Sequence, residues 1–384
     1  MKTIIPFVLF LLIFDTGFSQ SIPADSLYLG QTLPGNNPKL FAPSFLSCNG
    51  YFNEITISSN GKAIYYTEMR KGSEDGIKYF SYYNNKWNGP FLFFKGFGGA
   101  RLSRNDDTIF IQKGQWQPDS IQLAYYSTYN GKEWSKPKRF LKLTHCNLLQ
   151  ETNNCNYYCA GSPAVGSISK VDWCKIIFNN NDTIAVSLGR PLNGLGGGDF
   201  SVSKDDSFMI IAKGGQWVSF HKKDGTWTYP KWLGQVINFA RGSWGSYLSP
   251  DSKYLFYSPA SADDYSDARL YWVRIDNIID SLKKTNYVPY MNNQIMSQTA
   301  EINRFFKYTI PDSTFIDDDG NTTLNYKATL EDGTSLPSWL SFNSQTKTFS
   351  GMPEKLETIS ILLTAIDNEN ASISCKFKIE VMEK

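Results

Sequence analysis

The sequence predicts an all-β protein, a five- or six-bladed β-propeller followed by a small β-sandwich. Three observations lead to this class. Aromatic residues make up 15% of the 384 residues, which suits strands better than helices. A hairpin motif recurs along the first two thirds of the chain. After residue 284 the repeat stops, and from residue 298 shorter alternating segments separated by Asp/Gly and Asp/Asn turns take its place.

The first 19 residues are expected to form a cleaved secretory signal. One Lys precedes an apolar run over residues 4–14, and small residues follow at 17–19. We expect a secreted, periplasmic or cell-surface protein with no transmembrane segment once the signal is removed. The net charge is only +2, and no basic run is present, so nucleic acid is excluded as an expected partner.

Four copies of the hairpin motif align without gaps. They begin at Ile57, Leu102, Val202 and Leu248, and in each a Ser and a polar turn precede an apolar strand. The long interval between the second and third copies leaves room for a degenerate one, which we expect around Val171, with a Cys-rich insert before it. A unit of about 45 residues is typical of a four-stranded propeller blade. The propeller is therefore expected over residues 28–284.

This part of the chain resembles a known propeller family. The segments "YLGQTLPGNNPKLFAPSF", "LSPDSKYLFYS" and "ARLYWVRIDNIIDSLKK" are similar to bacterial WD-40-like repeat proteins of the Tol-associated periplasmic type. The resemblance implies a scaffold, a sensor or an appendage of an enzyme, and it says little about activity.

Residues 285–297 read as a polar linker, and residues 298–384 as a small sandwich. The segments "LPSWLSF" and "FSGMP", with Ala365-x-Asp367, resemble the dystroglycan-type cadherin-like, or Ig-like, domain. The resemblance implies an extracellular adhesion or recognition module that sometimes binds calcium. Asp317, Asp319 and Asp367, with Asp318 beside them, are the candidate calcium ligands, and the alternative is an acidic turn that faces water. Trp339 is expected in the core.

Four cysteines crowd into one stretch, Cys146, Cys155, Cys159 and Cys174, whereas Cys48 and Cys375 stand apart. A metal centre that includes His145 is one interpretation. Disulfides are the interpretation that an oxidising compartment favours.

The first strand of each hairpin is expected to line a central channel. Glu54 and Asp199 occupy equivalent positions there, and Arg101 lies near them in the alignment. Two carboxylates and a guanidinium suit a polar ligand, or an acid and a base for glycan cleavage. Trp116 and Trp217 are candidate platforms for sugar rings, and packing between blades is the alternative for both.

Taken together, the residues favour an exported, non-catalytic recognition, adhesion or scaffold protein. Its expected partner is a glycan, a peptide or a protein of the cell envelope. The alternative is a carbohydrate-active hydrolase or lyase that works through Glu54, Asp199 and Arg101. No cofactor is expected other than the candidate calcium.

Overall fold

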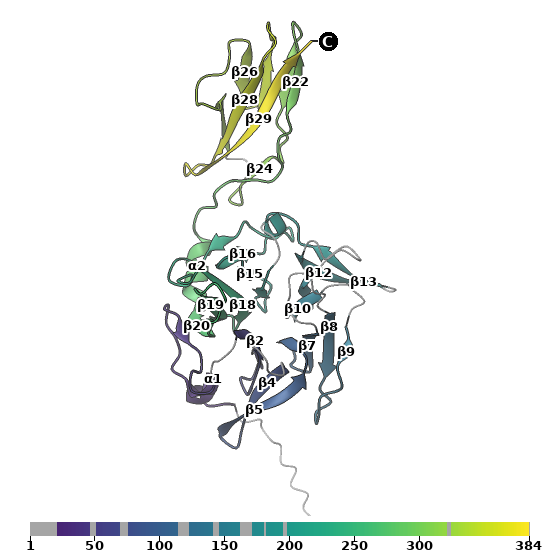
Figure 1. Ribbon diagram of the computed structural model, residues 1–384, viewed down its shortest axis with the longest axis vertical. Helices are drawn as coiled ribbons and strands as arrows, with labels where there is room; N and C mark the ends of the chain where they lie inside the picture. The colour runs from purple at the N-terminus through teal and green to yellow at the C-terminus, as the bar shows by residue number, and fades with distance from the viewer. Residues whose placement is uncertain are drawn as a thin grey trace, which may run out of the picture.

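The computed structural model describes residues 21–46, 51–69, 76–113, 123–140, 146–161, 171–179, 182–194, 198–320 and 324–383 (Figure 1). All structural statements below concern these ranges. The predicted signal peptide, Cys48, Trp116 and His145 lie outside them.

Five four-stranded antiparallel sheets are present in the described part of residues 39–274. The first contains β2 (Tyr51–Ile57), β3 (Ala63–Met69), β4 (Gly76–Tyr83) and β5 (Lys86–Lys95), and the second β6 (Gly98–Leu102), β7 (Thr108–Lys113), β8 (Leu123–Thr128) and β9 (Lys138–Arg139). The third contains β10 (Cys146–Glu151), β11 (Tyr157–Gly161), β12 (Asp172–Asn179) and β13 (Asp182–Ser187), and the fourth β14 (Phe200–Val202), β15 (Phe208–Ala212), β16 (Gln216–Phe220) and β17 (Lys231–Trp232). The fifth contains β18 (Gly242–Leu248), β19 (Tyr254–Ala260), β20 (Tyr271–Arg274) and, from the N-terminal end, β1 (Lys39–Leu40).

The sheets follow one another around a centre in a propeller-like arrangement (Figure 1). Each first strand neighbours the next, in the order β2, β6, β10, β14 and β18, and β18 lies against β2 again. Apolar side chains fill the spaces between adjacent sheets. Between the fifth and first sheets, for example, Trp272 packs against Phe41, whose ring centroid is 5.3 Å away, and Ile55 belongs to the same cluster. Packing between sheets therefore holds this part together.

The repeated Ser-containing turn has a local physical cause. The hydroxyl of each Ser accepts a hydrogen bond from the backbone amide five residues later, for example Ser58 from Ala63 at 2.8 Å and Ser249 from Tyr254 at 3.0 Å. The residue three positions after each Ser has a positive φ, as at Gly61 with 71°, where Gly, Asn and Asp are best tolerated. The motif is thus a self-contained turn.

The expected position of the degenerate copy was wrong. The turn of the third sheet is formed by Thr152 to Cys155, where Cys155 has the positive φ of 58°. Val171 instead directly precedes β12, which is the third strand of that sheet. The cysteines consequently lie within the repeat and not in an insert before it. The copy escaped alignment because Thr152 stands where the other turns have Ser, and Cys155 stands where they have Gly, Asp or Ser.

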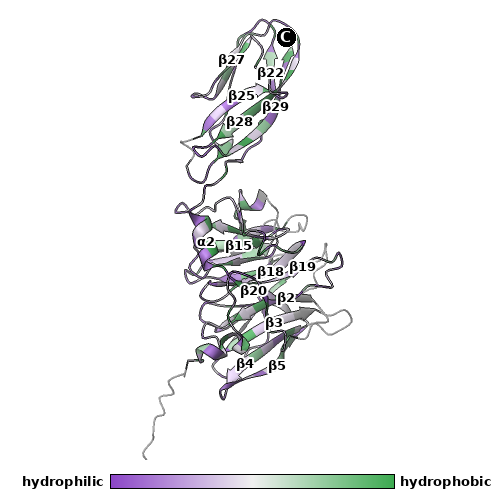
Figure 2. Ribbon diagram, turned by 90° about the vertical axis from the view of Figure 1, so that its left-hand side faces the viewer, coloured by the Kyte–Doolittle hydropathy of each residue, from purple (hydrophilic) through white to green (hydrophobic). Residues whose placement is uncertain are grey.

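Few helical turns accompany the sheets in the described ranges: η1 (Ala24–Ser26), α1 (Leu27–Gly30), η2 (Leu192–Gly194) and α2 (Asp276–Lys283). Ile279 of α2 is buried against the fourth and fifth sheets. The helix lies at the end of the propeller-like part that is nearest the sandwich (Figure 2).

The C-terminal part is a β-sandwich with its own core. One sheet has the order β22 (Gln298–Glu301), β29 (Ser372–Met382), β28 (Thr358–Ile366), β25 (Asn325–Leu330), and the other β23 (Phe306–Thr309), β27 (Thr348–Gly351), β26 (Leu340–Asn343). Phe349 and Ile361 are fully buried between them, and Trp339 is half-buried at the edge of this core. A further pair joins β21 (Tyr290–Met291) to β24 (Phe315–Ile316), so a part of the predicted linker pairs with the sandwich.

Candidate functional site

A set of hydrogen bonds links the first strands around the centre. At the equivalent position of four sheets, a side-chain oxygen accepts a bond from a backbone amide of the next sheet. The links run from Leu102 to Thr56 (3.4 Å), Val202 to Gln150 (3.1 Å), Leu248 to Ser201 (3.0 Å) and Ile57 to Tyr247 (2.8 Å). The last link joins the fifth sheet to the first.

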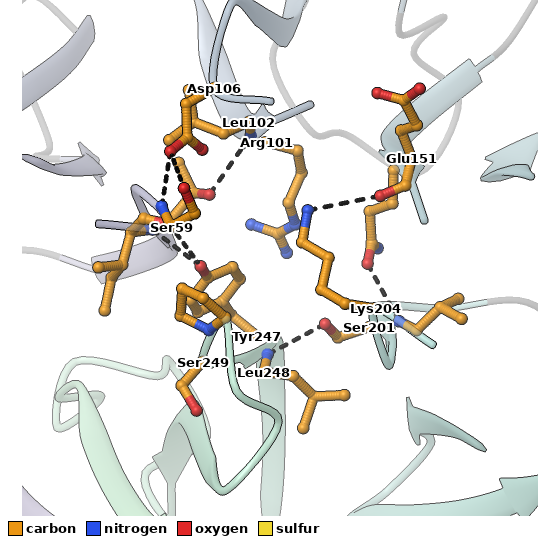
Figure 3. Close-up of a pocket in the computed structure, with 15 residues that line it drawn as sticks. Ser59, Arg101, Leu102, Asp106, Glu151, Ser201, Lys204, Tyr247, Leu248 and Ser249 are labelled. Atoms are coloured by element: carbon orange, nitrogen blue, oxygen red, sulfur yellow. Dashed lines mark hydrogen bonds between the residues drawn. The ribbon is translucent and has the colours of Figure 1, made fainter. Parts of the chain in front are cut away.

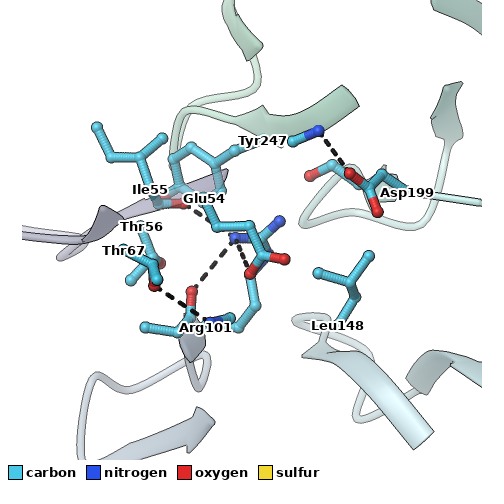
Figure 4. Close-up of polar contacts among 12 residues, drawn as sticks. Glu54, Ile55, Thr56, Thr67, Arg101, Leu148, Asp199 and Tyr247 are labelled. Atoms are coloured by element: carbon cyan, nitrogen blue, oxygen red, sulfur yellow. Dashed lines mark hydrogen bonds and ion pairs between the residues drawn. The ribbon is translucent and has the colours of Figure 1, made fainter. Parts of the chain in front are cut away.

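Arg101 occupies the fifth equivalent position and cannot make this bond, because a guanidinium only donates. Its two terminal nitrogens instead donate to the carbonyl oxygens of Ile55 at 3.0 Å and of Ser246 at 3.1 Å (Figure 4). Those carbonyls belong to the first and fifth sheets. Arg101 is 2% exposed, and its buried side chain links three sheets by hydrogen bonds.

Glu54 lies beside Arg101. Its Oε2 is 3.7 Å from Nη1 of Arg101 and makes no hydrogen bond within the described ranges. Burial raises the pKa of the Glu54 carboxyl to about 8, the Arg101 charge opposes that shift, and Asp199 adds to it. The proton of Glu54 is thus retained near neutral pH.

Asp199 is turned toward a neighbouring strand in Figure 4. Its Oδ2 accepts a 2.6 Å hydrogen bond from the backbone amide of Gly245, and burial raises its pKa. Neither Asp199 nor Glu54 lines the two cavities described below, although Arg101 lines one of them. The structure therefore brings the predicted trio together but engages all three in contacts within the protein.

Replacing Glu54 with Gln is expected to stabilise the protein at high pH. Between pH 4.5, the ordinary pKa of Glu, and about 8 the folded state holds a proton that the unfolded state has released, so this group's contribution is lost as the pH rises toward 8. The melting temperature of Glu54→Gln relative to the wild type should thus be higher at about pH 9 than at about pH 5. The exposed Glu133→Gln is the control, and an equal difference at both pH values for Glu54→Gln would contradict the shift.

Two adjoining cavities lie on the face that carries the repeated turns. The inner one, in the channel, has a volume of about 30 Å³, which suits about one water molecule. The outer one has about 380 Å³, which is within the range of ligand sites. We call the outer cavity the mouth groove; it is lined by Leu27, Tyr28, Ile57, Ser58, Ser59, Asn60, Gly61, Arg104, Asn153, Lys204, Pro250 and Asp251.

Lys204 lines both cavities, and its side chain points toward Arg101 and Glu151 (Figure 3). Its Nζ has a weak hydrogen bond, 3.5 Å long, to the carbonyl oxygen of Glu151. Burial lowers the pKa of Lys204, and the charges of Asp106 and Glu151 partly offset this. Donor capacity of this ammonium remains for a ligand.

The mouth groove carries two cations and one carboxylate. Arg104 contributes the second cation, and its Nε is 3.7 Å from Oε1 of Glu151. Asp251 is held by its own turn, since Oδ1 accepts bonds from the hydroxyl of Ser249 at 2.6 Å and the amide of Lys253 at 3.2 Å. The groove can therefore offer charged and amide donors to a polar ligand.

Sequence reasoning missed this lining. Ser59, Arg104, Asn153, Lys204 and Pro250 occupy one equivalent position of the turn, directly after the Ser or Thr. That position varies in every copy while its neighbours repeat. Variation within a repeated frame is the signal in the sequence that marks this position.

Trp217 lies on β16, and its indole Nε1 donates to the carbonyl of Lys213 at 3.1 Å. It is half-buried against a cluster shared by the third and fourth sheets, which contains Trp173 and Phe200. This environment favours packing over a sugar platform. Trp116 falls outside the described residues, and its role remains a prediction.

The candidate calcium ligands lie where the sandwich meets the propeller-like part, at a place we call the domain junction. Asp319 accepts a 2.5 Å bond from the amide of Tyr287, and Asp367 accepts one of 2.8 Å from the side chain of Asn286. Burial and the neighbouring aspartates raise the pKa of Asp317. Within the described ranges no group of three His, Cys, Asp or Glu side chains is placed to hold a metal. Calcium binding remains a prediction, which calorimetric titration of the whole protein can test.

Asp318 contacts the propeller-like part through both of its carboxylate oxygens. Its side chain is fully buried, Oδ1 is 3.0 Å from Nζ of Lys222, and Oδ2 accepts a 2.5 Å bond from the amide of Tyr229. Both partners belong to the segment between β16 and β17. The acidic turn therefore attaches the sandwich to the fourth sheet.

Cys146, Cys159 and Cys174 are buried, and Cys155 is exposed at its turn. All four are free thiols in this structure, so the predicted disulfides remain a prediction. The metal interpretation finds no support within the described residues.

Comparison with known protein families gives a match to the C-terminal part of the chain. Residues 288–382 match the family described as "Putative Ig domain". No curated protein matches the sequence. Among the described residues, no helix is long and apolar enough to span a membrane.

Several solved structures are similar in part. TolB from Acinetobacter baumannii shares 13% identity over 49% of this chain and 44% of its own, with a TM-score of 0.33. The extracellular domain of BT3049 from Bacteroides thetaiotaomicron shares 12% sequence identity over 86% of this chain and 44% of its own, with a TM-score of 0.35. The gluconolactonase XC5397 from Xanthomonas campestris shares 11% sequence identity over 63% of this chain and 96% of its own, with a TM-score of 0.34. The chain thus spans less than half of the first two, and these scores are too low to transfer a function. What is established is an all-β protein that carries an Ig-like domain at residues 288–382.

Proposed function

We propose that this is an exported recognition protein that binds a glycan, a peptide or a protein partner at the mouth groove. The groove carries the proposal, because a volume of about 380 Å³ is combined with ammonium, guanidinium and amide donors. The sandwich, which is attached at the domain junction, would give the same protein a second surface for recognition. Export itself rests on the predicted signal at residues 1–19.

We further propose that the five sheets are the blades of a closed five-bladed propeller. Two observations support closure: β18 lies against β2, and the hydroxyl of Tyr247 accepts a bond from the amide of Ile57. The strand β1 would complete the last blade by pairing with β20.

Glycan cleavage through Glu54 and Asp199 has less support. A general acid and a base need access to substrate, whereas Arg101 and the amide of Gly245 engage these carboxylates inside the protein. Turnover measured during ligand screening would restore the hydrolase or lyase alternative.

The test is a screen of the purified wild type against glycans and peptides, followed by titration of the best ligand. Lys204→Gln and Arg104→Gln should each weaken binding about tenfold or more, because charged hydrogen bonds contribute about 1.5–3 kcal/mol. Lys213→Gln is the matched control, an exposed lysine at the opposite end of β15 from the turn that carries Lys204. Unchanged affinity in both groove variants would reject the mouth groove as the binding site.

A further inference from the structure

Three buried cysteines lie on adjacent strands of the third sheet. Cys146 is on β10, Cys159 on β11 and Cys174 on β12, and their exposed fractions are 1%, 0% and 0%. The thiol of Cys159 has the other two thiols as hydrogen-bonding neighbours. The three form one contiguous cluster inside the apolar core between the second and third sheets.

The register distinguishes between the two neighbours of Cys159. Cys159 and Cys174 are directly opposed on antiparallel strands, which places their Cα atoms about 4.5–5.5 Å apart. That separation falls within the range of about 4.4–6.8 Å found for disulfides. A bond between these sulfurs needs rotation of the side chains and little movement of the backbone.

Cys146 is placed less favourably. It is opposite Gly161, two residues beyond Cys159, so it is a diagonal neighbour at about 7–8 Å. A bulge between Asn147 and Gln150 disturbs the register of β10 further along. Bridging Cys146 to Cys159 would need movement of the backbone.

We propose that Cys159 and Cys174 are joined by a cross-strand disulfide in the exported protein, and that Cys146 remains a buried thiol beside it. The two thiols lose two protons and two electrons as the S–S bond forms, and a disulfide oxidant takes them up and becomes two thiols. Since both sulfurs are buried in the folded state, the bond forms while the sheet is assembling. This inference does not depend on the proposed ligand site.

Peptide mapping of the wild type tests the proposal. The reduced, unfolded protein is refolded with oxidised and reduced glutathione, and the remaining thiols are alkylated in denaturant. Trypsin then releases residues 171–175, with Cys174, and residues 143–170, with the other three cysteines. We expect these two peptides to be linked. Chymotryptic cleavage after Tyr158 separates Cys159 from Cys146 and Cys155, and the link should stay with Cys159.

The oxidised wild type should melt about 5–10 °C above the reduced protein, as expected for a loop of this size. Cys155→Ser is the control and should keep the link, whereas Cys174→Ser should lose it. Alkylation of Cys159 and Cys174 in the refolded wild type would overturn the proposal, as would a link from Cys174 to Cys146 or Cys155. The mapping uses the wild type, so it decides the question even if Cys174→Ser does not fold.

Discussion

Replacing Arg101 with Met is expected to destabilise the protein by about 3–5 kcal/mol, because two buried hydrogen bonds from a charged donor are lost and each contributes about 1.5–3 kcal/mol. The change leaves the carbonyls of Ile55 and Ser246 without the donors that now link three sheets. It also removes the only effect given above that opposes the upward shift of the Glu54 pKa. Urea unfolding followed by tryptophan fluorescence measures the loss.

Arg104→Met is the matched control, because this arginine is 38% exposed and lies on the same face. It should cost about 1 kcal/mol or less. At about pH 9, above the pKa of about 8 of Glu54, the double variant Glu54→Gln/Arg101→Met should be less destabilised than the sum of its single variants, since no unpaired carboxylate is then left in the core. A decrease of less than about 1 kcal/mol in the free energy of unfolding of Arg101→Met would show that the hydrogen bonds of Arg101 are dispensable for stability.

Replacing Asp318 with Ala is expected to loosen the domain junction at a cost of about 2–4 kcal/mol. The ammonium of Lys222 and the amide of Tyr229 both lose their acceptor. Two separate unfolding transitions and a larger radius of gyration in solution scattering are the expected results. The sandwich itself should keep its fold, because the hydrogen-bond partners of the Asp318 side chain described above, Lys222 and Tyr229, both lie in the propeller-like part.

The control for this variant is Asp312→Ala. Asp312 forms an ion pair with Lys347 within the sandwich, but its side chain is 95% exposed, so little stability should be lost. An Asp318→Ala protein with unchanged scattering and one cooperative transition would contradict the role of the junction.

The repeated units could be predicted from sequence because their cause is local. The Ser hydroxyl and the residue with positive φ lie within one turn, so each copy carries its own evidence. The third turn was missed because it follows the same backbone path with Thr152 in place of Ser and with Cys155 in place of Gly, Asp or Ser. A pattern of residue types does not reveal equivalent hydrogen bonds made by different residues.

The candidate site could be predicted only in part. The alignment placed Glu54, Arg101 and Asp199 near one another, and the structure agrees. Their partners, however, are backbone groups of sheets distant in the chain, such as the amide of Gly245. Whether a polar residue binds a ligand or its own backbone depends on that tertiary context.

The pairing of β1 with β20 has a consequence for biosynthesis. Lys39 is opposite Trp272 in the completed sheet, so the fifth sheet cannot gain its outer strand until both ends of this region have been synthesised. Until then β1 has no partner strand and is open to pairing with another chain. A chaperone that holds the emerging polypeptide would be needed most during that interval.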